Sequence, residues 1–221
     1  MKDRHFTLPE KKGYDQAYEL AYKLACEQLL KVGDIEEQCR KSGAQYRVVE
    51  SEKAIVVKFL NQPYIITLPD VDVSLEGSSE EVPIREKLLI LHYFNSAKGT
   101  PAANSLITFR ELPEGGVYYP TFTKRTIEPI LRYFGKETQL LVGAGEKLGG
   151  HRVDYGDTAV TINAFSHVPV TIIIWRGDSE FAPRGSVVFD ATISDYLPTE
   201  DITVLCETIT WRLIRHLREN Q

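Results

Sequence analysis

Runs of apolar, β-branched residues predict where the strands of this chain lie. The run 170–175 is unbroken and too short for a globular helix, so it predicts a strand buried on both faces, at the centre of a sheet. A second run, 186–190, follows the turn signal Arg176-Gly177-Asp178 and predicts another strand. The rest of the chain is expected to be arranged around this pair.

Nearer the N-terminus the same pattern predicts a second block of strands. The runs 46–50, 54–60 and 64–68 are separated by connections of hairpin length, which favours an antiparallel meander of three strands. Two further stretches, 105–109 and 157–164, are also expected to be extended.

Apolar residues at helical spacing predict helices at both ends and in the middle of the chain. The expected helices are 14–32, 35–41 capped by Gly43, 83–96, 122–134, 137–148 and 198–217. The last has acidic residues at its start and arginines at its end, as the helix dipole favours. The stretch 111–120, ELPEGGVYYP, is expected to be a loop.

These elements predict the fold class. We expect an α+β fold, with an antiparallel or mixed sheet in two sequence blocks packed with the N-terminal, central and C-terminal helices. The 221 residues, with 43% hydrophobic and 26% charged residues, suit one globular domain over 1–221. If the chain has two domains, we expect the division at 101–116.

Composition and charge exclude several classes of partner. The formal net charge is −5 and no basic cluster accompanies it, which argues against nucleic acid as a partner. The N-terminus lacks the apolar run of a signal peptide, and no later stretch has the length of a membrane span. We therefore expect a cytoplasmic protein with no membrane partner.

The three cysteines do not form a metal-binding pattern. Cys26, Cys39 and Cys206 are odd in number and have no zinc or iron–sulfur spacing. We expect reduced, buried thiols and no metal centre built on them.

The densest polar group in the chain lies between the two C-terminal strands, and we interpret it as the candidate binding site. Asp178 and Glu180 stand two residues apart at the exit of a buried strand, which suits metal binding, acid–base chemistry or a polar ligand. The alternative is a polar turn in which Gly177 has a positive φ. The expected ligand-binding residues here are Trp175, Arg176, Asp178, Glu180, Phe181 and Arg184.

Asp190 follows the next predicted strand and has two interpretations. It completes an oxygen cluster for a hard cation with Asp178 and Glu180, or it caps the turn into 191–197.

Two histidines are candidate axial ligands to the metal of a tetrapyrrole or corrinoid. His167 lies between two predicted strands and His92 on an apolar helix, so each is equally a hydrogen-bonded structural histidine. We favour His167, because a turn leaves one face of the ring open. Four aromatics, Tyr118, Tyr119, Tyr155 and Trp175, are candidates for the wall of an apolar pocket or for ordinary packing.

Several segments together resemble a known family. The segments LPD at 68–70, PIREKLLILHYF at 83–94, FGKE at 134–137, LGG at 148–150 and WRGDSEF to VVFD at 175–190 resemble a domain-of-unknown-function family of anaerobic bacteria and archaea. Some members look as if they are fused to a four-cysteine iron–sulfur module like that of corrinoid proteins. The resemblance implies a role near anaerobic one-carbon metabolism. The cysteine cluster is absent here, so no iron–sulfur cofactor is carried over.

The sequence leaves three functions open. The first is a binding or accessory protein that handles a corrinoid, another tetrapyrrole or a protein partner; Trp175 and Phe181 would give apolar contact, and Arg176 and Arg184 would hold acidic groups. The second is an enzyme that uses Asp178, Glu180 and Asp190 as acid–base groups or through a divalent cation, although no catalytic motif is present. The third is a structural subunit of a larger complex.

Overall fold

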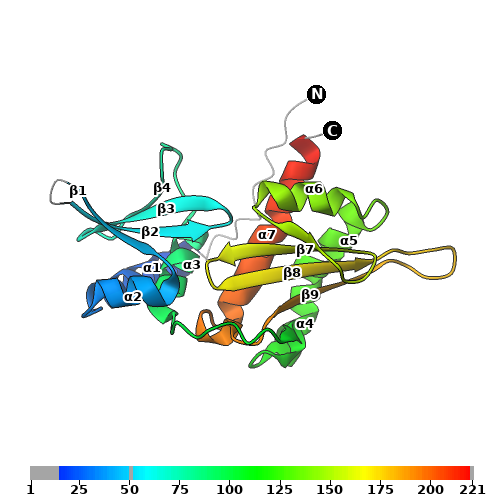
Figure 1. The fold of residues 1–221 in the computed structure, drawn as a ribbon, viewed down its shortest axis with the longest axis horizontal. Helices are drawn as coiled ribbons and strands as arrows, with labels where there is room; N and C mark the ends of the chain where they lie inside the picture. The colour runs from blue at the N-terminus through cyan, green and yellow to red at the C-terminus, as the bar shows by residue number, and fades with distance from the viewer. Residues whose placement is uncertain (1–14, 50–51, 220–221) are drawn as a thin grey trace.

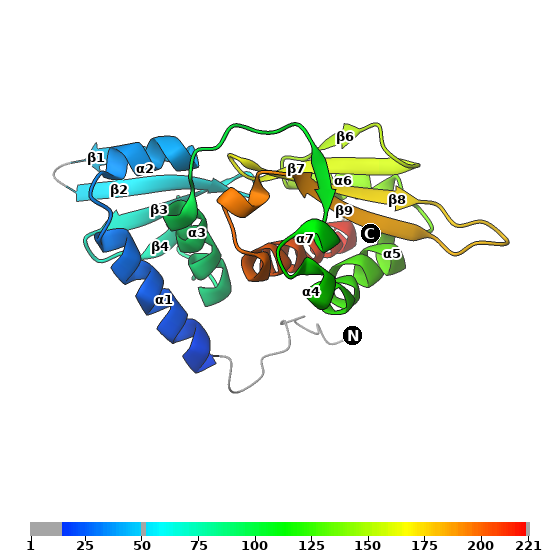
Figure 2. The ribbon, with the colours of Figure 1, turned by 90° about the horizontal axis from the view of Figure 1, so that it is seen from below.

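The computed structural model describes residues 15–49 and 52–219, which form two antiparallel sheets with helices packed against them. The predicted α+β class is confirmed, and the strand pairs within the described residues are antiparallel. The two sheets lie side by side, and the C-terminal helix runs beneath the second sheet (Figures 1 and 2).

The first sheet has the strand order β1-β2-β3-β4 and is packed with three helices. Its strands are β1 (Gln45–Val49), β2 (Glu52–Phe59), β3 (Gln62–Leu68) and β4 (Val73–Leu75). The helices are α1 (Asp15–Leu30), α2 (Ile35–Ser42) and α3 (Ile84–Ser96). Gly43 ends α2 with φ of 66°, as the predicted C-cap requires.

The second sheet has the strand order β5-β9-β8-β7-β6 and contains the predicted C-terminal strand pair. Its strands are β5 (Leu106–Thr108), β6 (His151–Val153), β7 (Thr158–Phe165), β8 (Val168–Trp175) and β9 (Arg184–Asp190). Strand β8 is central in this sheet, as predicted, and is mostly buried as far as Trp175.

The helices of the second half are α4 (Gly115–Phe122), α5 (Glu128–Phe134), α6 (Leu140–Lys147) and α7 (Thr199–Glu219). A π-helical turn, Thr123–Ile127, joins α4 to α5, and short 3₁₀ turns occupy Phe109–Glu111 and Ile193–Asp195.

The prediction of a loop over 111–120 was wrong, because helix α4 begins at Gly115. A Cβ atom at this position would collide with the carbonyl oxygen of Phe109, so glycine allows the helix to start against the preceding turn. The short strands β4 and β6 were not predicted, since three residues are too few to show an alternating pattern.

A column of stacked aromatic rings joins the two sheets. The Phe165 ring on β7 lies 4.0 Å from Tyr93 on α3 and 4.8 Å from Phe59 on β2, measured between ring centroids. At one end of the column Tyr64 meets Phe59 edge-on, with the ring planes inclined by 60°, and at the other end Tyr196 stacks on Tyr93. Beside it the Leu60 amide donates a 2.9 Å hydrogen bond to the carbonyl oxygen of Ala164. One hydrophobic cluster therefore contains residues of both sheets.

Charged pairs also link α3 to α7. Arg85 contacts Glu207 at 2.9 Å, and the His92 Nδ1 lies 2.7 Å from a carboxylate oxygen of Asp201. A third pair extends the link toward β3, because the Arg212 guanidinium lies 2.6 Å from Glu86 and donates to the Tyr64 hydroxyl at 3.1 Å.

The aromatic column predicts that the two sheets unfold together. The change Phe165→Ala should lower the free energy of unfolding by about 3–5 kcal/mol, because it removes a fully buried ring. Chemical denaturation of the wild-type chain, followed by circular dichroism and by tryptophan fluorescence, should give coincident single transitions.

The control is Phe181→Ala, which truncates a ring that is 69% exposed and should change stability by less than about 0.5 kcal/mol. Two separated transitions in the wild-type chain would contradict a shared core.

Candidate functional site

The β8–β9 hairpin carries most of the predicted binding residues. Its loop, 176–183, projects beyond the other strands of the second sheet (Figures 1 and 2). Trp175 and Arg184 are directly opposed in the register, so their side chains leave the same face of the hairpin.

Asp178 shapes the hairpin loop. Its carboxylate accepts hydrogen bonds from the backbone amides of Glu180 at 2.8 Å and Phe181 at 2.7 Å. The same two amides lower the pKa of Asp178 below its ordinary value. The Asp178 amide in turn donates to the carbonyl oxygen of Phe181 at 2.9 Å. The loop is therefore held in a defined turn.

Gly177 is required in this turn for a different reason from the one predicted. Its φ is not positive. A Cβ atom here would lie 2.7 Å from the Pro183 ring and 2.8 Å from the carbonyl oxygen of Phe181, so the loop closes too tightly for a side chain.

Three aromatic side chains remain exposed at this end of the second sheet. The exposed fractions are 38% for Trp175, 69% for Phe181 and 47% for Tyr155, which lies in the turn between β6 and β7. The Trp175 ring approaches within 3.3 Å of the Cβ position of Gly156, so this turn and the hairpin are neighbours. The aromatic residues predicted to line one pocket do not lie together, because Tyr119 lines a separate hollow at α4.

Two arginines accompany these rings. Within residues 15–49 and 52–219, neither the Arg176 nor the Arg184 guanidinium forms an ion pair. The Arg176 backbone amide donates to the Asp157 carboxylate at 2.8 Å, which ties the base of the loop to the β6–β7 turn. We define the tip surface by its members, Tyr155, Trp175, Arg176, Phe181 and Arg184. Glu180 is an exposed residue of the same loop.

Asp190 lies at the other end of β9 and is a structural acceptor. It is 6% exposed and accepts hydrogen bonds from the amides of Ala103, Asn104 and Thr192 and from the Thr192 hydroxyl, all between 2.7 and 3.0 Å. Burial raises the pKa of Asp190, but these hydrogen bonds outweigh it and hold the pKa below its ordinary value. These contacts agree with the interpretation of Asp190 as a cap of the turn that follows β9.

The three predicted carboxylates do not share a site. Strand β9 separates Asp190 from the hairpin loop, and six residue steps in an antiparallel strand span about 20 Å. Across residues 15–49 and 52–219 no group of three or more histidine, cysteine or acidic side chains is arranged to hold a metal ion.

His167 also lies away from the tip surface, in the turn at the opposite end of β8. Its exposed ring lies 5.5 Å from the Tyr196 ring, and its Nε2 is 3.1 Å from the Cβ position of Gly43. The other candidate histidine, His92, pairs with Asp201 between α3 and α7.

The cysteines are free thiols, as predicted. Cys39 and Cys206 are buried and Cys26 is half-buried. Burial, with a smaller contribution from Glu36, raises the pKa of Cys39 to about 11, and burial also raises that of Cys206. These two thiols are therefore poor nucleophiles at neutral pH.

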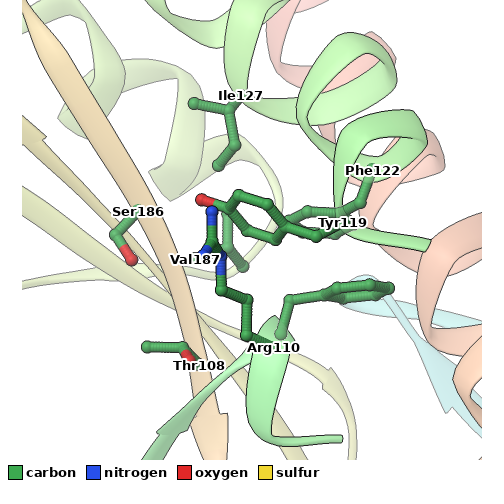
Figure 3. A pocket seen from close by; sticks show the side chains of 8 residues that line it. Thr108, Arg110, Tyr119, Phe122, Ile127, Ser186 and Val187 are labelled. Carbon is green, nitrogen blue, oxygen red and sulfur yellow. The ribbon is translucent and has the colours of Figure 1, made fainter. Parts of the chain in front are cut away.

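A hollow of about 80 Å³ lies between β9 and α4 (Figure 3). The Arg110 guanidinium lies 4.0 Å above the Tyr119 ring inside it. Its lining residues are Thr108, Phe109, Arg110, Tyr119, Phe122, Ile127, Ser186 and Val187. Sequence analysis missed this hollow because its residues come from distant segments with no common motif.

A second, open hollow of about 400 Å³ lies beside the start of α3. It is lined by Glu19 of α1 and by 81–84. Tyr119, a candidate pocket-wall residue, lines the first hollow, whereas the predicted ligand-binding residues of 175–184, Asp190 and His167 line neither.

Comparison with known proteins identifies a family. A family model described as a domain of unknown function (DUF3786) matches residues 34–212. No curated protein and no solved structure matches the chain. Among the described helices, none combines the length and the apolar character needed to cross a membrane.

The contacts of Asp190 predict a pH-dependent stability change. The change Asp190→Asn should lower the free energy of unfolding at pH 7 by about 1–3 kcal/mol, because one acceptor oxygen is lost among buried amide donors. Since the pKa of Asp190 is lower in the folded state, its contribution is present above its ordinary pKa of about 3.9 and is lost as the pH falls through the folded value. Urea unfolding at several pH values should therefore show the difference from wild type shrinking below about pH 4.

Asp178→Asn is the matched control, because Asp178 is fully exposed and an asparagine oxygen can still accept from the loop amides. An equal loss of stability in both variants would contradict the structural role given to Asp190.

Proposed function

The chain belongs to the DUF3786 family of domains of unknown function, and on that premise we propose that it is a non-catalytic binding protein that engages a protein partner through the tip surface. The observation that carries this proposal is the combination of exposed aromatic rings and arginines without ion pairs at one end of the second sheet.

The composition of the tip surface suits protein recognition. Tryptophan, tyrosine and arginine dominate the energetically important positions of protein interfaces. Trp175, Phe181 and Tyr155 offer apolar area, and the Arg176 and Arg184 guanidinium groups would pair with carboxylates. The expected partner therefore presents an apolar segment flanked by acidic side chains.

The hairpin loop is also organised before binding. The Asp178 hydrogen bonds and the contact of Pro183 with Gly177 restrict the loop, so less conformational entropy would be lost when a partner docks.

The enzyme alternative has less support. It needs Asp178, Glu180 and Asp190 in one place, and β9 separates Asp190 from the other two. The third alternative, a structural subunit of a larger complex, is supported by apolar side chains exposed on α1. Leu20 and Leu24 lie one turn apart there and are 60% and 50% exposed.

A version in which the partner is a corrinoid or another tetrapyrrole places the axial ligand at His167. The exposed His167 ring supports it, but neither hollow includes this residue. A role in anaerobic one-carbon metabolism rests on the family resemblance alone.

The protein-binding proposal predicts loss of a partner on mutation of the tip surface. Affinity capture from an extract of the source organism, quantified by mass spectrometry, should recover a protein with wild type that is lost with Trp175→Ala and with Arg184→Glu. With that partner purified, each change should weaken binding by about 2 kcal/mol, or roughly thirtyfold. Binding should also weaken as salt concentration rises.

Two variants are matched controls. Tyr118→Ala truncates an exposed ring on α4, and Arg132→Glu reverses an exposed charge on α5, so both should retain the partner. A partner lost equally with the controls, or kept by both tip variants, would exclude the tip surface as its binding site.

The cofactor version predicts a spectroscopic result. Protein purified without oxygen and mixed with a corrinoid or a haem should retain the chromophore with shifted absorbance bands, and His167→Ala should abolish the shift. Tyr196→Phe serves as the control, because it keeps the ring beside His167. A chain that retains neither compound would exclude this version and leave the protein-binding proposal in place.

A further inference from the structure

Strand β9 has one edge that is only half covered. Strand β8 pairs with β9 from Arg184 to Phe189, but on the other side β5 pairs only with Val188 to Asp190. We propose that the free half of this edge, 184–187, binds an extended acidic segment of a protein partner as an added strand.

The backbone direction identifies the groups that would pair with this segment. The Ala191 amide donates to the carbonyl oxygen of Ser105 at 2.8 Å, toward β5. Backbone groups of an antiparallel strand point to alternate sides, so Gly185 and Val187 direct theirs to this same side. The register ends at Thr108 with Val188, so beyond it no residue of β5 pairs with Gly185.

The side chains along this half-edge permit close approach. Gly185 and Ser186 are small and only half-buried, and Arg184 is exposed, whereas Val187 is buried and lines the hollow with Arg110 and Tyr119. Natural edge strands are usually protected by bulges, prolines or inward charges, and within 184–187 the edge has no proline. The Leu131 side chain of α5 lies next to Gly185, so helix α5 supports this end of β9.

The hollow at the end of β5 supplies the charge that favours an acidic segment. The Arg110 guanidinium stacks on Tyr119 there, and no acidic side chain lines the hollow (Figure 3). The nearest acid in sequence, Glu111, is already engaged, because its carboxylate accepts from both the amide and the hydroxyl of Thr108 at 2.7 Å. A carboxylate on the added strand would pair with Arg110.

This inference shares Arg184 with the tip surface but does not depend on its side chain, because the outward backbone groups are those of Gly185 and Val187. Strand addition uses main-chain hydrogen bonds for affinity and adjacent side-chain contacts for specificity. A partner could therefore bind the half-edge whether or not Trp175 and Phe181 contribute.

A proline at position 185 tests the main-chain contact. Gly185→Pro removes an amide that points away from β8, so the paired side of the strand keeps its hydrogen bonds. Gly185→Ala is the matched control: it adds the same Cβ atom, 3.2 Å from the Leu131 side chain, and keeps the amide. Circular dichroism and thermal unfolding would establish that both variants fold.

The probe is a displayed library of random peptides, selected on the wild-type chain. We expect enrichment of peptides with alternating β-branched residues and at least one acidic residue. Binding of the enriched peptides should fall about tenfold or more with Gly185→Pro and little with Gly185→Ala. Arg110→Ala should weaken binding similarly, and Arg110→Lys should restore part of it.

Hydrogen exchange locates the bound peptide. The amides of Gly185 and Val187 should become protected when the peptide is added. The proposal would be overturned by a library without enriched sequences, by peptides that bind Gly185→Pro and Gly185→Ala equally, or by unchanged exchange at these amides. A wild-type chain that dimerises in sedimentation experiments, and loses the dimer with Gly185→Pro, would show that a second copy occupies the edge instead.

Discussion

The contact of Phe165 with Tyr93 and Phe59 is the constraint on which the arrangement of the two sheets depends. It places the end of β7 against β2 and α3, and the hydrogen bond from Leu60 to Ala164 aligns the two strands there. Because β7 is fixed at this end, the β7–β8 turn with His167 faces the first sheet, and the β8–β9 loop extends from the opposite end of the hairpin. The separation of His167 from the tip surface therefore follows from the core.

The polar residues that suggest chemistry in the sequence mostly stabilise turns. Asp178 accepts from two amides of its own loop, and Asp190 accepts from the 103–104 segment and from Thr192. When several backbone amides donate hydrogen bonds to a carboxylate, they lower its pKa and leave fewer of its lone pairs for a ligand. Around the hairpin loop, Trp175, Arg176, Glu180, Phe181 and Arg184 keep exposed side chains.

Sequence patterns predicted the parts of this fold that depend on local periodicity. The strands around 170–175 and 186–190, the three-stranded meander and the helix ending near Leu217 are all present, because their apolar residues recur with the period of the element. The start of α4 was predicted to be a loop. Gly115 allows the helix to begin because it lies close to the Phe109 carbonyl oxygen, and a local sequence pattern does not show that contact. Among the candidate site residues, 175–184 lie together at one end of the second sheet. Asp190, for which the sequence left a cation cluster and a turn cap open, lies at the other end of β9 and accepts hydrogen bonds from Thr192.

The open half of the β9 edge has a local cause. The Glu111 carboxylate binds the amide and hydroxyl of Thr108, which turns the chain into a 3₁₀ helix and ends β5 after three residues. Gly115 then lets α4 begin directly against Phe109, and Tyr119 and Ile127 line the hollow beside Val187. The free edge is therefore produced by specific residues between Thr108 and Gly115. A longer β5 would require loss of the Glu111 contacts and displacement of α4, so the edge stays available as long as this segment keeps its fold.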